Sequence, residues 1–120
     1  MAGAKLPADT TRALPRWVSA LRFDDLPSEV VAAAKLQTLD TLAVAWAGSR
    51  AESVDPVRSA TAGTGGAPQA RVWCFGDRLP ATQAGFLNAM LAAALDYDTL
   101  HDRANAHHDG GVLPAAARLP

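Results

Sequence analysis

The residues that could do chemistry are concentrated in one segment near the C-terminal end, DYDTLHDRANAHHD, which spans residues 96–109. This segment contains four aspartates and all three histidines of the chain. An imidazole titrates near neutral pH, and a carboxylate beside it can help to remove or return a proton at one substrate carbon. The residue types therefore indicate acid/base catalysis as one hypothesis for this segment.

Two other interpretations fit the same residues. His101, His107 and His108 are suitable metal ligands, as are the nearby aspartates, but no His-Glu-x-x-His or paired Cys/His spacing fixes a coordination geometry. Alternatively, Asp96 and Asp98 accept hydrogen bonds from backbone amides in a turn while the histidines are solvated. The residues alone leave catalysis, metal binding and a structural role open.

A helix from Pro80 to Leu95 is predicted to position this segment. Its apolar residues recur at helical spacing along one face, at Ala84, Leu87, Met90, Leu91, Ala94 and Leu95. Because a helix is rigid and the loop after it leaves side chains free to face a cavity, catalytic residues are commonly held in this way. We therefore expect residues from Asp96 onward to form the functional site.

The rest of the chain is also predicted to be helical, so the expected fold is all-α over residues 1–120. Apolar spacing and capping residues predict helices over Thr10–Leu21, Pro27–Gly48 and Pro56–Ala62. The glycine-rich residues 63–68 are predicted to form a loop. Residues 70–75 are the sole candidate strand, and because they have no obvious partner we expect an extended connection with Trp73 packed against helices.

Several side chains are assigned to the interior by their position in these helices. The stripe that includes Trp17 is expected to face a core, and Trp46 is expected to be a core residue. We expect Asp40 and Thr41 to be a buried hydrogen-bonding pair or to make a helix contact. Cys74 is expected to be an inert, packed thiol, because it has no close basic neighbour.

Composition excludes several classes of protein. With 120 residues, of which 49% are apolar, the chain has the size and hydrophobic content of one globular domain. Eleven basic and twelve acidic residues give a net charge of −1, which disfavours nucleic acid and anionic membranes as partners. A single cysteine and an N-terminus without an apolar signal region favour the cytoplasm. The longest apolar run is too short to span a bilayer, so a soluble protein is expected.

Residues 78–116, RLPATQAGFLNAMLAAALDYDTLHDRANAHHDGGVLPAA, resemble the MmgE/PrpD family. In that family an Ala-rich helix containing an Asn leads into Asp-Phe/Tyr-Asp-Asp-Thr-His-Asp, then His-Pro-Gly and a helix that begins Val-Leu-Pro-Ala-Ala. The matching residues are Asn88, Asp96, Tyr97, Asp98, His101, Asp102, His107 and Val112 to Ala116. Residues 26–49 are also similar to the family's early helix, whose hallmark is Leu-Asp-Thr-Leu-Gly followed by small residues.

The resemblance implies a two-domain fold, in which this chain belongs to a large all-α domain and later sequence supplies a smaller α/β domain. Family members act on small polycarboxylates without a metal or an organic cofactor, and a homodimer is expected for the full-length form. Their reactions include dehydration of 2-methylcitrate, decarboxylation of cis-aconitate and epimerisation of iminodisuccinate. All of these reactions share a proton transfer next to a carboxylate.

By resemblance, Asp96 and His107 fall on active-site positions and are expected to be catalytic. His107 is the expected proton donor or acceptor, because imidazole titrates near neutral pH. Thr99, His101 and Arg103 are expected to bind the substrate, and Arg103 is the one arginine in the segment.

The sequence also departs from the family pattern. Thr99 replaces the second Asp of the Asp-Asp-Thr triplet and Leu100 replaces the Thr, while His108 and Asp109 replace the Pro and Gly after the histidine. A hydroxyl expected to hold a substrate carboxylate is therefore displaced to Thr99 or lost.

Family members continue for several hundred residues beyond the Val-Leu-Pro helix, and a Lys and a further His from that region complete the active site. This sequence ends at Pro120. We therefore expect a partial lyase or isomerase that lacks the cation needed for catalysis. The alternatives are a non-catalytic helical remnant or interaction module, and an adventitious metal-binding module that uses the three histidines.

Overall fold

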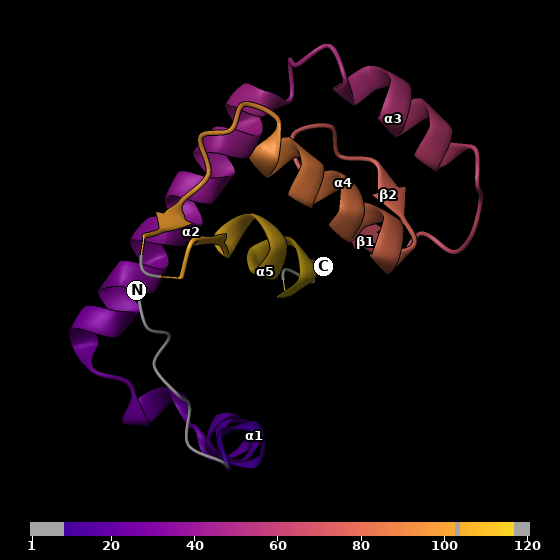
Figure 1. Ribbon diagram of the computed structural model, residues 1–120. Helices are drawn as coiled ribbons and strands as arrows, with labels where there is room; N and C mark the ends of the chain where they lie inside the picture. The colour runs from indigo at the N-terminus through magenta and orange to yellow at the C-terminus, as the bar shows by residue number, and fades with distance from the viewer. Residues whose placement is uncertain (1–8, 103, 117–120) are drawn as a thin grey trace. The chain divides into compact units, whose positions relative to one another are not determined.

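The computed structural model describes residues 9–102 and 104–116 (Figure 1). The described residues form five α-helices, α1 (Thr10–Ala20), α2 (Ser28–Gly48), α3 (Val54–Ala62), α4 (Ala81–Ala93) and α5 (Asp109–Ala116). A 3-10 turn, η1 (Phe23–Asp25), and four strands of two residues each complete the secondary structure of this part. The expected all-α fold is confirmed, and each of the four predicted helices is present to within a few residues of its predicted ends.

The chain divides into two compact units after Ala33, and the first contains α1, η1 and the start of α2. The carboxylate of Asp25 accepts the backbone N–H of Arg22 at 2.9 Å, which closes the turn between the two helices. The apolar stripe of α1 is not buried, since Trp17 is 60% exposed and its neighbours Leu14 and Val18 are similar. The prediction that this stripe faces a core is therefore wrong within this unit, because no residue of α1 is buried.

Helix α2 is apolar around much of its circumference, a pattern typical of a helix that is covered on all sides. In the structure its buried residues are Thr41, Ala45 and Gly48, spaced so that they share one face. Thr41 makes the expected helix contact, because its hydroxyl donates to the Gln37 carbonyl at 2.9 Å. Asp40 is exposed, so the two residues do not form a buried pair.

The buried face of α2 packs closely against α4 at Gly48. A methyl group at this position would overlap the carbonyl oxygen of Leu91 and press on the Cβ of Ala94. Trp46 lies on a different face of the helix and is 63% exposed, so the prediction that it is a core residue is wrong. Close approach of two backbones at Gly48 buries one narrow face and leaves the large side chains of α2 uncovered.

By length and composition, α2 is also the one described helix that could cross a membrane. Sequence reasoning dismissed a membrane span because it counted uninterrupted apolar residues, whereas the whole helix is long enough. Core helices of soluble proteins satisfy the same criterion, so this property is weak evidence for a membrane segment.

Helix α4 supplies the centre of the core in the second unit. It begins after Pro80, and its buried residues are Ala84, Leu87, Asn88, Leu91 and Ala92. The core cluster adds Ala45 from α2, Val54 from α3, and Ala70, Val72 and Trp73 from the connection before α4. Of the face predicted from the sequence, Met90 and Ala94 are half-buried and Leu95 is 42% exposed, because α4 ends at Ala93.

The connection before α4 forms a small antiparallel hairpin, β1 (Ala70–Arg71) and β2 (Arg78–Leu79), with Ala70 opposite Leu79. The expectation of an extended connection without a strand partner is wrong, because β2 pairs with β1. The partner was missed because two residues are too few to show an alternating pattern. Trp73 is buried as predicted, at 8% exposure.

Asn88 holds this hairpin against α4. Its Oδ1 accepts the buried backbone N–H of Trp73 at 2.8 Å, and its Nδ2 donates to the carbonyl of Arg71 at 3.2 Å. A buried amide whose donor and acceptor are both used fixes one position of the turn on the helix. The asparagine in the family-like pattern is therefore a structural residue here.

The turn of this hairpin contains Cys74, in the left-handed region with φ of 66°. Cys74 is exposed, so the expectation that it is packed is wrong. Partial burial of the sulfur nevertheless raises the pKa of the Cys74 thiol, while a hydrogen bond with Ser49 acts in the opposite direction. Because the thiolate is the reactive form, the raised pKa agrees with an unreactive thiol.

An ion pair joins α3 to the same hairpin. Arg58 Nε lies 2.5 Å from Asp77 Oδ2, and the Arg58 guanidinium stacks 4.4 Å from the centroid of the Phe75 ring. The hydrogen bond to Asp77 raises the pKa of Arg58. Since this arginine is engaged in packing the fold, it is not a free anion-binding group.

Candidate functional site

The titratable segment is built on a second hairpin, which joins α4 to α5. Its strands are β3 (Leu100–His101) and β4 (Ala106–His107), paired with Leu100 opposite His107 and His101 opposite Ala106. The carbonyl of His101 accepts the N–H groups of Ala104 and Asn105, and Asn105 adopts a left-handed φ of 48°. Asparagine tolerates this conformation, which lets a four-residue loop reverse the chain. Sequence reasoning predicted a loop here and missed the two strands.

The hairpin separates the histidines. Because successive side chains of a strand point to opposite faces, the register places His101 on the face opposite to His107. His101 instead contacts His108, with ring centroids 6.2 Å apart at an interplanar angle of 75°. The three histidines therefore do not converge on one point.

His107 is paired with a buried carboxylate. Its Nδ1 lies 3.1 Å from Oδ2 of Asp98, whose side chain is 7% exposed, whereas the His107 side chain is 45% exposed. Nε2 of His107 has no hydrogen-bond partner in the part of the chain that the structure describes. One nitrogen is thus held from the protein side while the other is free to meet a substrate.

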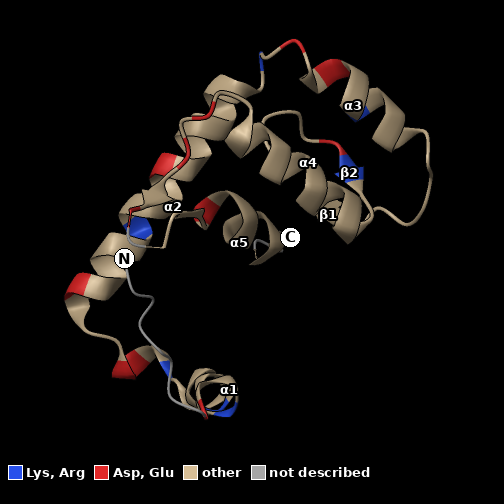
Figure 2. Ribbon diagram, viewed as in Figure 1, with Lys and Arg blue, Asp and Glu red and all other residues tan. Residues whose placement is uncertain are grey.

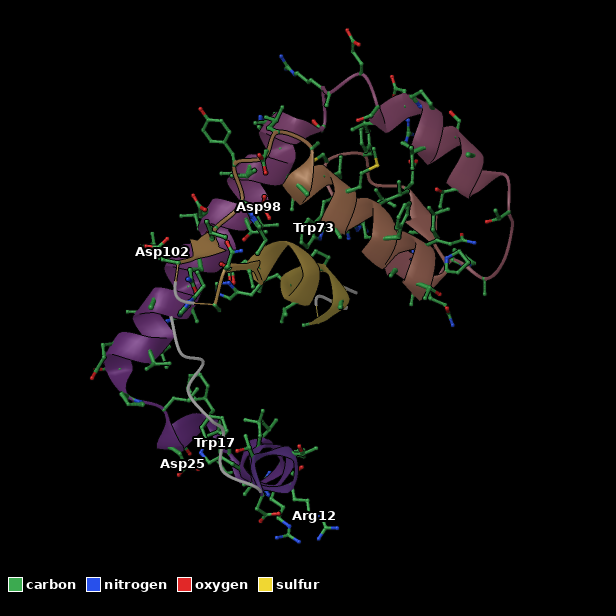
Figure 3. The ribbon with its side chains drawn as sticks, in the orientation of Figure 1. Arg12, Trp17, Asp25, Trp73, Asp98 and Asp102 are labelled. Atoms are coloured by element: carbon green, nitrogen blue, oxygen red, sulfur yellow. The ribbon has the colours of Figure 1, made fainter. Side chains whose placement is uncertain are left out.

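Asp98 comes from the segment between α4 and β3, and Asp102 lies in the loop between the hairpin strands (Figure 3). The Asp98 carboxylate lies beside the first turn of α5, since its Oδ2 is 3.2 Å from where a Cβ on Gly110 would stand. The start of a helix carries partial positive charge and unpaired N–H groups, which favour a carboxylate. The sequence could have suggested this position through the glycine pair that opens α5.

A second carboxylate, Asp109, is buried at the same helix start. Its side chain is 9% exposed, and Oδ1 lies 3.3 Å from Nε2 of His108. Its Oδ2 has no hydrogen-bond partner among the described residues. Sequence reasoning treated Asp109 as a departure from the family pattern and did not anticipate its burial.

Asp96, the other predicted catalytic residue, is exposed and follows the end of α4 in a left-handed conformation with φ of 54°. Its N–H donates to the Ala93 carbonyl at 3.0 Å. Within the described residues it forms no ion pair with His107, which pairs with Asp98 instead. A catalytic role for Asp96 stays a prediction.

The predicted substrate-binding residues are dispersed. Thr99 is half-buried, and His101 is exposed with its Nδ1 accepting the Ala104 N–H at 3.1 Å. Arg103 lies outside the described residues. The expectation that Asp98 bonds a backbone amide in a turn is not met among the described residues, where its carboxylate meets the imidazole of His107.

The charge of the segment is one-sided. Figure 2 shows acidic residues along the connection from α4 to α5 and no Lys or Arg on its described residues, 94–102 and 104–116. A cavity of about 470 Å³ beside α4 and α5 is lined by small apolar residues such as Ala84 and Pro114 and by none of the predicted site residues. No group of three metal-ligating side chains occurs among the described residues. The described residues of this segment therefore hold an imidazole–carboxylate pair and no Lys or Arg.

Comparison with known proteins agrees with the resemblance. Residues 12–118 match the MmgE/PrpD N-terminal domain. Cis-aconitate decarboxylase from Aspergillus terreus is 32% identical over 114 residues, covering 95% of this chain, and the protein of that name from Aspergillus terreus strain NIH 2624 gives the same values. The chain spans 23% of the length of these relatives, and no solved structure matches it significantly. The chain belongs to the MmgE/PrpD family, whose N-terminal domain accounts for nearly all of its sequence.

Proposed function

We propose that this chain contributes the N-terminal helical part of a lyase that acts on small polycarboxylates, with His107 as the general acid or base. The observation that carries the proposal is the half-exposed imidazole of His107, tied through Nδ1 to the buried carboxylate of Asp98. Membership of the MmgE/PrpD family supports the reaction class. The relative named cis-aconitate decarboxylase supports a tricarboxylate as the substrate.

The chemistry needs one group that exchanges a proton at a carbon next to a carboxylate. In a decarboxylation, the carbon–carbon bond breaks, carbon dioxide leaves, and the electron pair left on carbon takes a proton from the imidazolium Nε2–H. In a dehydration, neutral Nε2 removes the proton before hydroxide leaves. His107 can serve either direction, because the nitrogen that is not held by Asp98 can accept a proton when the imidazole is neutral and donate one when it is protonated.

Such a reaction also needs positive charge, both to bind the substrate carboxylates and to stabilise the negative charge that develops in the transition state. The described residues from 94 to 116 contain no Lys or Arg. Arg103 stays a proposed substrate-binding residue, and we propose that the cation needed for catalysis comes from sequence that corresponds to the remaining three-quarters of the relatives' length. On this proposal the 120 residues by themselves do not turn over substrate.

The alternative function, a non-catalytic helical module, has one observation in its favour. Large apolar side chains of α2 are exposed, including Leu36 at 68%, Leu39 at 65% and Trp46 at 63%. Exposed apolar surface of this kind marks interaction sites. Under the enzyme proposal the same face packs against the remainder of the enzyme or its second subunit, in a cytoplasmic homodimer that uses no cofactor.

The test uses a chimera in which this chain replaces the 114 matched residues of the Aspergillus decarboxylase. A cooperative melting transition shows that the chimera folds. We expect it to consume cis-aconitate or 2-methylcitrate, measured by absorbance and mass, and His107→Ala to lower kcat by roughly 10²- to 10⁴-fold.

Asp102→Ala is the matched control, because Asp102 is an exposed carboxylate of the same hairpin without an ion pair among the described residues. It should change kcat less than roughly threefold, which is small beside the effect of a lost acid or base. A folded chimera without activity on either substrate would favour the non-catalytic module. Full activity of His107→Ala would remove His107 from the mechanism.

A further inference from the structure

We infer that Asp98 is the positioning residue of His107, and that Gly110 is the residue whose missing side chain makes room for it. This inference rests on the proposed function, in which His107 exchanges the proton, and it adds what fixes the orientation and tautomer of that imidazole. The juxtaposition comes from three places in the sequence: the loop after α4, the end of β4 and the first turn of α5.

The orientation follows from burial. The Asp98 side chain is 7% exposed, so the atoms around it restrict the position of its carboxylate. The His107 side chain is 45% exposed, so its ring would be free to rotate without a partner. The contact of 3.1 Å between Nδ1 and Oδ2 holds the ring at the end of β4. The contact also fixes the tautomer of the neutral imidazole. Because a carboxylate can only accept a hydrogen bond, the nitrogen that faces it, Nδ1, carries the proton, and the lone pair is on Nε2.

The position of Asp98 in turn depends on the start of α5. A Cβ on Gly110 would stand 3.2 Å from Asp98 Oδ2 and 3.9 Å from the Cβ of Ala92, so the carboxylate fills the space that a side chain would take. A Cβ on Gly111, the next residue, would have no atom within 4 Å. Of these two adjacent glycines, Gly110 is buried against Asp98 and Ala92, whereas Gly111 is exposed and would not bring a Cβ near Asp98.

This arrangement separates the roles of the aspartates. Asp98 touches His107 and acts through it, so it is a positioning residue and not a catalytic one. Asp109 pairs with His108, and His101 contacts the same ring. The second group of contacts does not include His107, so changes in it should leave the tautomer of His107 unaltered.

The experiment measures the tautomer of His107 in the 120-residue chain by long-range ¹⁵N–¹H correlation, at a pH where the imidazole is neutral. We expect the proton on Nδ1 and the lone pair on Nε2. Asp98→Ala should move the proton to Nε2, which free imidazole side chains ordinarily prefer. Gly110→Ala should shift the equilibrium in the same direction while keeping both charged groups, and Gly111→Ala and Asp102→Ala should leave it unchanged.

A wild-type His107 with its proton on Nε2, or one whose tautomer is the same in Asp98→Ala, would overturn the inference. An equal response to Gly110→Ala and Gly111→Ala would overturn the part assigned to Gly110. Gly110→Ala also covers the case in which Asp98→Ala does not fold, because it retains the carboxylate and favours the helix.

Kinetics then separate this inference from the proposed function. In the active chimera, Asp98→Ala should lower kcat by at least tenfold with little change in KM, because a wrong tautomer affects proton transfer more than binding. If the chimera is inactive but the His107 tautomer depends on Asp98, the proposed function is contradicted and the positioning role of Asp98 is supported. If the chimera is active but the tautomer does not depend on Asp98, the proposed function is supported and the positioning role is contradicted.

Discussion

Replacing Asn88 by Ala should destabilise the second unit, because this amide connects α4 to the hairpin before it. The side chain is 2% exposed, and both of its hydrogen bonds go to backbone groups, the Trp73 N–H at 2.8 Å and the Arg71 carbonyl at 3.2 Å. Deleting it leaves the Trp73 N–H buried without a partner. The Arg71 carbonyl lies at an exposed residue, where water can replace the amide.

The magnitude follows from these two environments. An unpaired buried N–H costs about 1–3 kcal/mol, and the exchange of the second hydrogen bond for water costs roughly 0.5–1 kcal/mol. The free energy of unfolding should therefore fall by about 1.5–4 kcal/mol. For a chain of this size, that loss corresponds to a decrease in Tm of roughly 10 °C.

The assay is urea unfolding followed by circular dichroism at the helical band, with Tm from thermal melting. Gln83→Ala is the matched control, since it removes an amide from the same helix whose hydrogen bond, to Thr64, is exposed. It should change the free energy of unfolding by less than about 0.5 kcal/mol. Hydrogen exchange of the Trp73 N–H gives a local measure and should accelerate in Asn88→Ala alone. Equal stability of the two variants would refute the reasoning.

Four further predictions concern other parts of the chain. Circular dichroism of the 120-residue chain should show mainly helix, and a strand-dominated spectrum would contradict the fold. The chain should self-associate through α2, and Leu39→Lys with Trp46→Lys should shift sedimentation toward the monomer, whereas unchanged sedimentation would exclude this face. Asp96→Ala should lower the free energy of unfolding by about 1 kcal/mol and Asp96→Gly should not, because the left-handed φ of 54° is tolerated by Asp, whose side chain can hydrogen-bond locally, and by Gly, which has no Cβ, but not by Ala; equal melting temperatures would contradict this reason. Because burial raises the pKa of Cys74, the folded state keeps its thiol proton to higher pH than the unfolded state, so this contribution to stability is present at neutral pH and is lost as pH rises through the folded pKa. Iodoacetamide should accordingly label Cys74 slowly in the native chain at neutral pH and faster in urea, and equal rates would contradict the shift.

The helices could be predicted from the sequence because each is long enough to show periodicity. The α4 face was found through Leu87 and Leu91, which are both 1% exposed. Burial on α2 was not predicted correctly, because apolar residues occur around the helix and periodicity cannot select the covered face. The buried face of α2 is the one that contains Gly48, where the helix approaches α4 closely. In the sequence, a glycine at a close helix contact cannot be distinguished from a glycine that ends a helix.

The candidate site was located from composition and family resemblance, but its internal pairing was not. Asp96 and Asp98 are two residues apart in a short irregular segment, and nothing in their types indicates which carboxylate reaches an imidazole nine residues beyond Asp98. The pairing depends on the register of two-residue strands and on the left-handed turn at Asn105, which return the chain over itself. Strands of this length carry no periodic signal.

The position of Asp98 also shows why a family pattern and a physical site need not agree residue by residue. The pattern places a second Asp and then a Thr after Asp98, and this chain has Thr99 and Leu100 at those two positions. Leu100 lies in β3 directly opposite His107, so the hydroxyl that the pattern would place beside the histidine is replaced by an aliphatic side chain. A substitution of Leu100 by Thr should therefore leave the fold intact and change substrate affinity in the active chimera, seen as a lower KM with a smaller change in kcat. An unchanged KM would show that the face of the hairpin shared by Leu100 and His107 does not meet the substrate carboxylate.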